Sequence, residues 1–109
     1  MVEAVFSRVS NKLVEFKAQG HAESSNEEGF DLVCSAISAS SIMIANGITE
    51  VLCISAAISE KDGFLHINLG MLCENDIEKC QVLMETLLLG LKSIEQSYGE
   101  YIKVLIEEV

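Results

Sequence analysis

A long stretch of helical periodicity near the C-terminus constrains the fold of this chain more than any other feature. Between about Asn75 and Tyr98, apolar side chains recur every three or four residues and share one helix face: Ile77, Cys80, Met84, Leu87, Leu88, Leu91 and Ile94. A helix with one apolar face buries it against another layer of the same domain. The rest of the chain is therefore expected to supply that layer.

Short segments with strand periodicity are the candidates for this layer. In the second of them, Val14, Phe16 and Ala18 alternate with Glu15 and Lys17, which predicts a strand with one buried face. The predicted strands cover about Ala4–Val9, Leu13–Ala18, Val51–Ser59, Phe64–Leu69 and Tyr101–Glu108.

Two polar turns and one further helix complete the predicted order. Ser10–Lys12 and Lys61–Gly63 have the composition of hairpin turns. Val51–Ser59 is apolar throughout, which is typical of a central strand buried on both faces. With a helix between the second and third strands, the order is ββαββαβ. It predicts an α+β fold, a mixed sheet with two packed helices, and a single domain over residues 1–109.

The first helix is predicted from about Leu32 to Asn46. Asp31 is a suitable N-cap, and Gly47 is a suitable C-terminal stop. Serine and alanine are frequent along this segment. Because small side chains let other backbone approach closely, we expect this helix to be largely buried.

The charge of the chain limits the classes of partner that it is expected to bind. Seven Lys and Arg residues against 17 Asp and Glu residues give a formal net charge of -10. Nucleic-acid binding depends on cationic contacts to phosphate, so direct binding of nucleic acid is not expected. An acidic surface favours encounter with a basic partner, although it also serves simply to keep a small protein soluble.

The location of the protein is expected to be cytoplasmic. The N-terminal stretch MVEAVFSRVS lacks the basic start and apolar centre of a signal peptide. The longest continuous apolar run is too short to cross a bilayer, so no membrane association is expected.

The four cysteines indicate neither disulfides nor a metal site. A cytosolic chain disfavours disulfides, and no pair has the CxxC spacing of a zinc site. No metal or other cofactor is expected. Cys53 and Cys80 lie in apolar segments and are interpreted as small core residues, whereas Cys73 has no evident partner.

Cys34 differs because it would lie in the first turn of a helix capped by Asp31. First-turn N–H groups lack intrahelical acceptors, so they would stabilise a thiolate and lower the pKa of the thiol. Ser38 follows one turn later on the same face, close enough for a hydrogen bond near the sulfur. Asp31 has the alternative of serving as a cap alone.

His21 is the candidate base for Cys34, because imidazole commonly activates a cysteine nucleophile. It ends the second strand, next to Gly20, and the polar loop that follows runs to Gly29. Gly20 and Gly29 would serve as the hinges of this loop. The alternative is a chance pairing of one cysteine with one histidine. His66, which alternates within a strand, is expected to have no chemical role.

The residues around His21 and Cys34 resemble the signature of the ribosomal-processing cysteine protease family, Prp. The matching positions are Gly20-His21-Ala22 and then, after a short loop, Gly29, Asp31, Val33, Cys34, Ala36 and Ser38. Ser35 departs from the alanine more usual in the family. The chain length and element order fit as well, so the resemblance extends over essentially the whole chain.

This resemblance implies a cytoplasmic endopeptidase that removes the N-terminal extension of a basic bacterial large-subunit ribosomal protein, number twenty-seven, during ribosome assembly. It implies Cys34 as the nucleophile, His21 as the general base, supporting roles for Asp31 and Ser38, and a homodimer. Two other functions remain open. One is a non-catalytic acidic partner of a basic ribosomal protein, and the other is a redox protein that uses Cys34.

Overall fold

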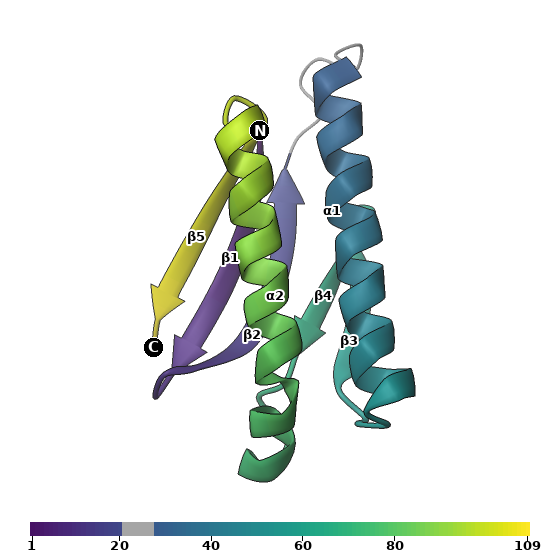
Figure 1. Cartoon of the computed structure of the whole chain (residues 1–109), viewed down its shortest axis with the longest axis vertical. Coiled ribbons are helices and arrows are strands. Elements are labelled where there is room, and N and C mark those ends of the chain that lie inside the picture. Colours follow the sequence, from purple (N-terminus) through teal and green to yellow (C-terminus); the bar gives the residue numbers. More distant parts are fainter. Residues whose placement is uncertain (21–27) are drawn as a thin grey trace.

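The computed structural model describes residues 1–20 and 28–109 and has the predicted ββαββαβ order (Figure 1). The two helices and the mixed sheet confirm the predicted α+β fold. The elements are β1 (Val2–Val9), β2 (Lys12–Gly20), α1 (Glu28–Asn46), the π-helical turn η1 (Gly47–Val51), β3 (Ala57–Lys61), β4 (Phe64–Asn68), α2 (Glu74–Tyr98) and β5 (Ile102–Glu108).

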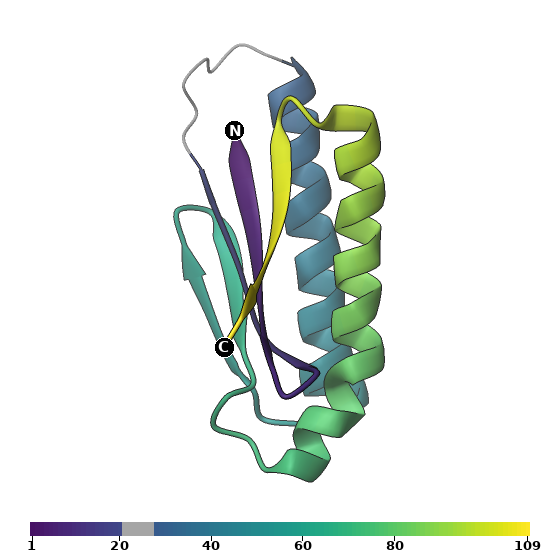
Figure 2. The same cartoon turned by 90° about the vertical axis from the view of Figure 1, so that its left-hand side faces the viewer.

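The sheet has the strand order β3-β4-β2-β1-β5. Neighbouring strands are antiparallel except β1 and β5, which are parallel. Both helices lie on the same face of the sheet (Figure 2). The N-terminal strand β1 is therefore interior to the sheet, with β2 on one side and the C-terminal strand β5 on the other.

The core lies between this face of the sheet and the two helices. Phe6 of β1 and Phe16 of β2 pair across the strands, and their ring centroids are 5.0 Å apart. The predicted apolar face of α2 is confirmed, with Ile77 and Ile94 at its half-buried margins and five residues buried: Cys80, Met84, Leu87, Leu88 and Leu91. Periodicity alone thus located α2 to within a residue at its start.

A β-bulge changes which side chain of β2 enters the core. Ser7 pairs with Glu15 and Arg8 pairs with Leu13, so Val14 is an extra residue between them. Leu13 is fully buried, whereas Val14 is half-buried. The predicted alternation was therefore wrong at Val14. The carbonyl of Val14 instead accepts a hydrogen bond of 2.7 Å from the N–H of Leu69.

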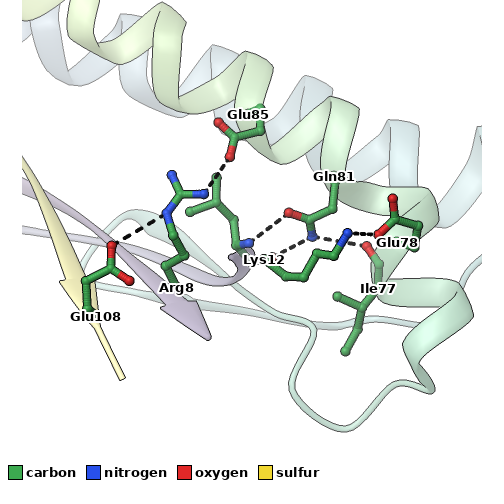
Figure 3. A network of polar contacts seen from close by, with 8 residues as sticks. Arg8, Lys12, Ile77, Glu78, Gln81, Glu85 and Glu108 are labelled. Atoms are coloured by element: carbon green, nitrogen blue, oxygen red, sulfur yellow. Dashed lines mark hydrogen bonds and ion pairs between the residues drawn. The ribbon is translucent and has the colours of Figure 1, made fainter. Parts of the chain in front are cut away.

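Side chains of α2 form hydrogen bonds and ion pairs with the β1–β2 hairpin (Figure 3). The Gln81 side chain accepts a hydrogen bond from the N–H of Leu13 and donates one to the Leu13 carbonyl, both at 2.8 Å. Arg8 donates to Glu85 at 2.9 Å, and Lys12 forms an ion pair with Glu78. Gln81 thereby satisfies backbone groups of Leu13 beside the bulge.

The central strand predicted over Val51–Ser59 was wrong. η1 continues the helix through Val51, and the chain then turns at Cys53, whose φ is 57°. Ile54 is buried after this turn, and the strand that follows, β3, lies at the edge of the sheet. Cys53 is exposed, so its interpretation as a core residue was also wrong, whereas Cys80 is fully buried as expected.

Helix α1 is buried on one side only, contrary to expectation. Val33, Ile37 and Ile44 face the core, but Leu32 and Met43 on the outer side are 55% and 72% exposed. The helix also does not stop at Gly47, because η1 extends it by one turn. The small residues of α1 therefore do not indicate burial on all sides.

The span Gly29–Val51 is long and apolar enough to cross a membrane by length and composition. Core helices of soluble proteins meet the same criterion, so it is weak evidence for a membrane span. Of this span, 33% is buried in the molecule. Apolar side chains therefore lie on the outer side of α1 as well as on the side that faces the core.

Candidate active site

A hollow of about 360 Å³ lies beside Cys34, where α1 passes the end of β2 and the β3–β4 hairpin. Cys34 and Ser38 come from α1, Gly20 ends β2, and Gly63 is in the hairpin turn. The full lining comprises Gly20, Phe30, Cys34, Ser35, Ser38, Asp62, Gly63 and Phe64. The hollow thus joins three parts of the chain that are distant in sequence.

Cys34 is half-buried on α1, and its side chain also packs against the core. Ser38 lies one turn later and lines the same hollow. Within the described residues, no hydrogen bond joins the Ser38 hydroxyl to the Cys34 sulfur. Cys34 and Ser38 are therefore neighbours, as predicted, but the described residues show no hydrogen bond between them.

Asp31 is not the N-cap of α1, which corrects the predicted start of the helix. The helix begins at Glu28, so Asp31 lies within it and is exposed. Extension of the helix is favoured because Phe30 packs against the core. Cys34 therefore lies beyond the first turn, and its N–H is committed to the carbonyl of Phe30 by the regular α-helical pattern. The N–H groups at Cys34 are not free to stabilise a thiolate or an oxyanion.

The pKa of the Cys34 thiol is raised, not lowered as predicted. Burial is the main cause, and the carboxylate of Asp31 adds to it, while the N-terminal ammonium of Met1 acts in the opposite direction. Among the described residues, the surroundings of Cys34 thus favour the neutral thiol. Activation of this sulfur requires a base that removes its proton.

His21, the predicted base, lies outside the described residues. Gly20, which directly precedes it, lines the same hollow as Cys34. The end of β2 and the part of α1 that carries Cys34 therefore border the same hollow. Gly20 and Gly29 were predicted as hinges. Neither has a φ in the left-handed region, and at both positions a side chain would collide with neighbouring atoms. Their role as hinges stays a prediction.

Sequence reasoning did not assign the β3–β4 hairpin to this site. Asp62 and Gly63 have φ values of 53° and 84°, which are typical of a tight two-residue hairpin turn. The turn itself was predicted from Lys61–Gly63, but its position beside Cys34 depends on the strand order. Phe30 and Phe64, which also line the hollow, carry no local signal that distinguishes them from core residues.

The remaining histidine, His66, lies on the sheet and away from the Cys34 hollow. Its Nε2 is 2.6 Å from a carboxylate oxygen of Glu15, and Asn68 donates to the same oxygen at 3.4 Å. In the described part of the chain, no three His, Cys, Asp or Glu residues are placed to hold a metal ion. A larger hollow of about 550 Å³ beside Lys12 and Glu78 is lined by neither cysteine nor histidine.

Comparison with known proteins supports an enzymatic function for the chain. The profile of the family described as Cysteine protease Prp matches residues 1–103. No curated protein matches this sequence. Several solved structures do, and they cover nearly the whole chain.

SMU.848 from Streptococcus mutans is 34% identical, with a TM-score of 0.80 over 100% of this chain and 96% of that one. The essential ribosomal processing protease Prp from S. aureus, in complex with a substrate peptide, is 25% identical. Its TM-score is 0.79 over 98% of this chain and 100% of that one. A second structure of the S. aureus protease holds a covalently linked product peptide, with 26% identity, a TM-score of 0.75 and the same coverage.

Proposed function

Because the chain belongs to the Prp family of cysteine proteases, we propose that it removes the N-terminal extension of large-subunit ribosomal protein number twenty-seven in the cytoplasm. Cys34 is the nucleophile and His21 is the general base. Asp31 and Ser38 border or influence the nucleophile. The substrate assignment follows from the family resemblance, and the S. aureus relative is itself a ribosomal processing protease.

The observation that carries the proposal is the shared hollow of Gly20 and Cys34. Gly20 directly precedes His21 in the sequence. This supports a pairing of His21 with Cys34. The covalently linked product in the S. aureus structure supports a nucleophilic mechanism for the family.

The raised pKa of Cys34 determines how the reaction starts. Since burial and Asp31 favour the thiol, His21 accepts the thiol proton as the sulfur attacks the scissile carbonyl carbon. The proton passes to the leaving amine when the C–N bond breaks, which leaves a thioester on Cys34. Water then attacks the thioester, with His21 as base, releasing the new carboxyl group and restoring the thiol.

The charge of the chain supports a basic substrate. The formal net charge is -10, and electrostatic attraction speeds the encounter of oppositely charged proteins. A ribosomal protein that binds RNA carries the complementary charge. The charge supports an encounter with a basic substrate, but it does not determine where the substrate is cut.

The outer face of the two helices supports a homodimer. We define the helix face as Leu32, Ile42 and Met43 of α1 with Val82 and Leu89 of α2, all of which are exposed. From Leu32 to Asn46, α1 contains no charged residue. Two copies of a chain with a charge of -10 repel one another, and this repulsion opposes contact least at an uncharged part of the surface. This apolar face therefore suits contact with a second copy.

The test is an intact-mass assay with the extended ribosomal protein as substrate. The wild-type protein and a Cys73→Ala variant are expected to release a short N-terminal peptide, whereas Cys34→Ala is expected to bind without cutting. Cys73 is a suitable control because it is exposed and lies outside the hollow. Cleavage by Cys34→Ala would show that this residue is not the nucleophile. Binding without cleavage by all three proteins, the wild type included, would indicate a non-catalytic partner.

A further inference from the structure

The starts of β1, β5 and α1 lie at the same end of the molecule as the end of β2 (Figures 1 and 2). Two glycines occupy this end, Gly20 at the end of β2 and Gly29 in the first turn of α1. Each is surrounded too closely to accept a side chain. The atoms that surround them belong to the first residues of the chain and to Tyr101.

Tyr101 packs directly on Gly29. A Cβ atom at Gly29 would lie 2.5 Å from Cε2 and 2.7 Å from Cζ of the Tyr101 ring. Real Cβ atoms do not approach other atoms this closely, so a side chain at residue 29 would require the ring or the helix to shift. The ring also packs against the core, which limits how far it can withdraw.

The backbone of Tyr101 is held on both sides. Its N–H donates to the carbonyl of Tyr98 at 2.9 Å, and its carbonyl accepts a hydrogen bond of 2.8 Å from the N–H of Val2. Val2 in turn pairs with Gly20 across the β1–β2 ladder. A Cβ at Gly20 would lie 2.8 Å from the Cα of Val2, so these two backbones are in close contact.

A continuous series of contacts therefore runs from Gly20 through Val2 and Tyr101 to Gly29. It connects the end of β2 with the first turn of the helix that carries Cys34. We infer that Tyr101 is a positioning residue for the protease. Its ring fixes the first turn of α1, and its hydrogen bond to Val2 fixes that turn relative to Gly20. Because this role is defined by cleavage, it rests on the proposed function.

The test is a double-mutant cycle on cleavage of the extended ribosomal protein with Gly29→Ala, Tyr101→Ala and the double variant. Gly29→Ala pushes α1 away from the ring, and misplacement near a reacting group lowers kcat on the order of tenfold to a hundredfold. Tyr101→Ala removes the ring and is itself expected to lower kcat. Because the Gly29→Ala side chain then has no ring to collide with, the double variant is expected to have the kcat of Tyr101→Ala alone and not the product of the two losses. Fraction folded is measured for every variant by circular dichroism.

Two matched controls separate positioning from general packing. Gly90→Ala changes a helical glycine whose Cβ would meet nothing within 4 Å, and Tyr98→Ala changes a more exposed tyrosine at the end of α2. Both are expected to keep the wild-type kcat. Effects on kcat that multiply in the double variant, or that merely follow the fraction folded, would overturn the positioning role.

A second readout is independent of the substrate. If the wild-type protein does not cut the ribosomal protein, the proposed function is wrong, and the rate of Cys34 alkylation by iodoacetamide is measured in the same variants. The background is Cys53→Ser and Cys73→Ser, because both cysteines are exposed. Alkylation rates that differ from wild type in Tyr101→Ala and are the same in the double variant support the positioning of Cys34 by Tyr101. Wild-type rates in Tyr101→Ala, or multiplicative changes in the double variant, overturn it.

Discussion

After burial, the carboxylate of Asp31 is the strongest influence that raises the pKa of the Cys34 thiol, from a position one turn earlier on α1. Replacing Asp31 with Asn removes this negative charge and is expected to lower the thiol pKa. Cys34 should then be alkylated faster by iodoacetamide at neutral pH, in a background of Cys53→Ser and Cys73→Ser. Asp62→Asn is the matched control, because Asp62 lines the hollow but is not a cause of the shift. Equal rates in the two variants would contradict this role of Asp31.

The raised pKa of Cys34 also predicts how stability depends on pH. The folded state holds the thiol proton more tightly than the unfolded state does. The stabilisation is therefore complete below the unfolded pKa, about 8.5 for a thiol, and is lost as the pH rises through the folded pKa. In urea unfolding, the wild-type protein should lose more stability between neutral and alkaline pH than Cys34→Ser does. A Cys73→Ser control should behave like the wild type, and an identical loss in Cys34→Ser would refute the prediction.

Gln81 is expected to matter more for stability than the nearby ion pair. Gln81→Ala leaves the part-buried N–H and carbonyl of Leu13 without their side-chain partner. The loss should lower the free energy of unfolding by about 1–3 kcal/mol. Glu78→Ala removes an exposed ion pair with Lys12 and should cost about 0–1 kcal/mol. Urea unfolding measures both. Equal losses would show that Gln81 acts only as another surface contact.

Gly63 in the β3–β4 turn is required for its backbone conformation and not for space. Its φ is 84°, and a Cβ there would meet nothing within 4 Å. Gly63→Ala is therefore expected to lower the free energy of unfolding by about 1–2 kcal/mol, and Gly63→Asn by less, since asparagine tolerates this conformation better. Thermal and urea unfolding distinguish the two. Asn proving as harmful as Ala would point to a cause other than φ.

The proposed dimer is tested on the helix face. Ile42→Lys and Leu89→Lys place a charge on exposed apolar positions of α1 and α2 and should convert a dimer into monomers in sedimentation velocity experiments. Met71→Lys is the control, because Met71 is 95% exposed and precedes α2 outside the helix face. A monomeric wild-type protein, or dissociation by all three substitutions alike, would argue against this interface.

The elements that periodicity defines could be predicted from the sequence, whereas those that depend on distant contacts could not. The apolar face of α2 is local and is confirmed, and β4 forms where a strand was predicted, although its burial does not alternate strictly because Phe64 is buried as well as Ile67. The start of α1 was misplaced because Asp31 has the properties of an N-cap, whereas the helix begins three residues earlier and includes Gly29. In the structure this glycine makes room for Tyr101, which comes from the other end of the chain.

The candidate site shows the same division. A strand–loop–helix connection permits the end of β2 to approach Cys34, and Gly20 and Cys34 do line the same hollow. The direction of the Cys34 pKa shift was wrong because burial of the sulfur depends on packing around α1. The contribution of Asp62 and Gly63 depends on the strand order, which brings the β3–β4 hairpin beside β2.

The parallel pairing of β1 with β5 has a consequence for synthesis. Val2 pairs with Ile102, so the first strand translated must wait for the last one to emerge before its ladder is complete. Until then, β1 exposes an unpaired edge that can recruit strands of other chains. A nascent chain of this protein is thus expected to need protection until β5 has emerged.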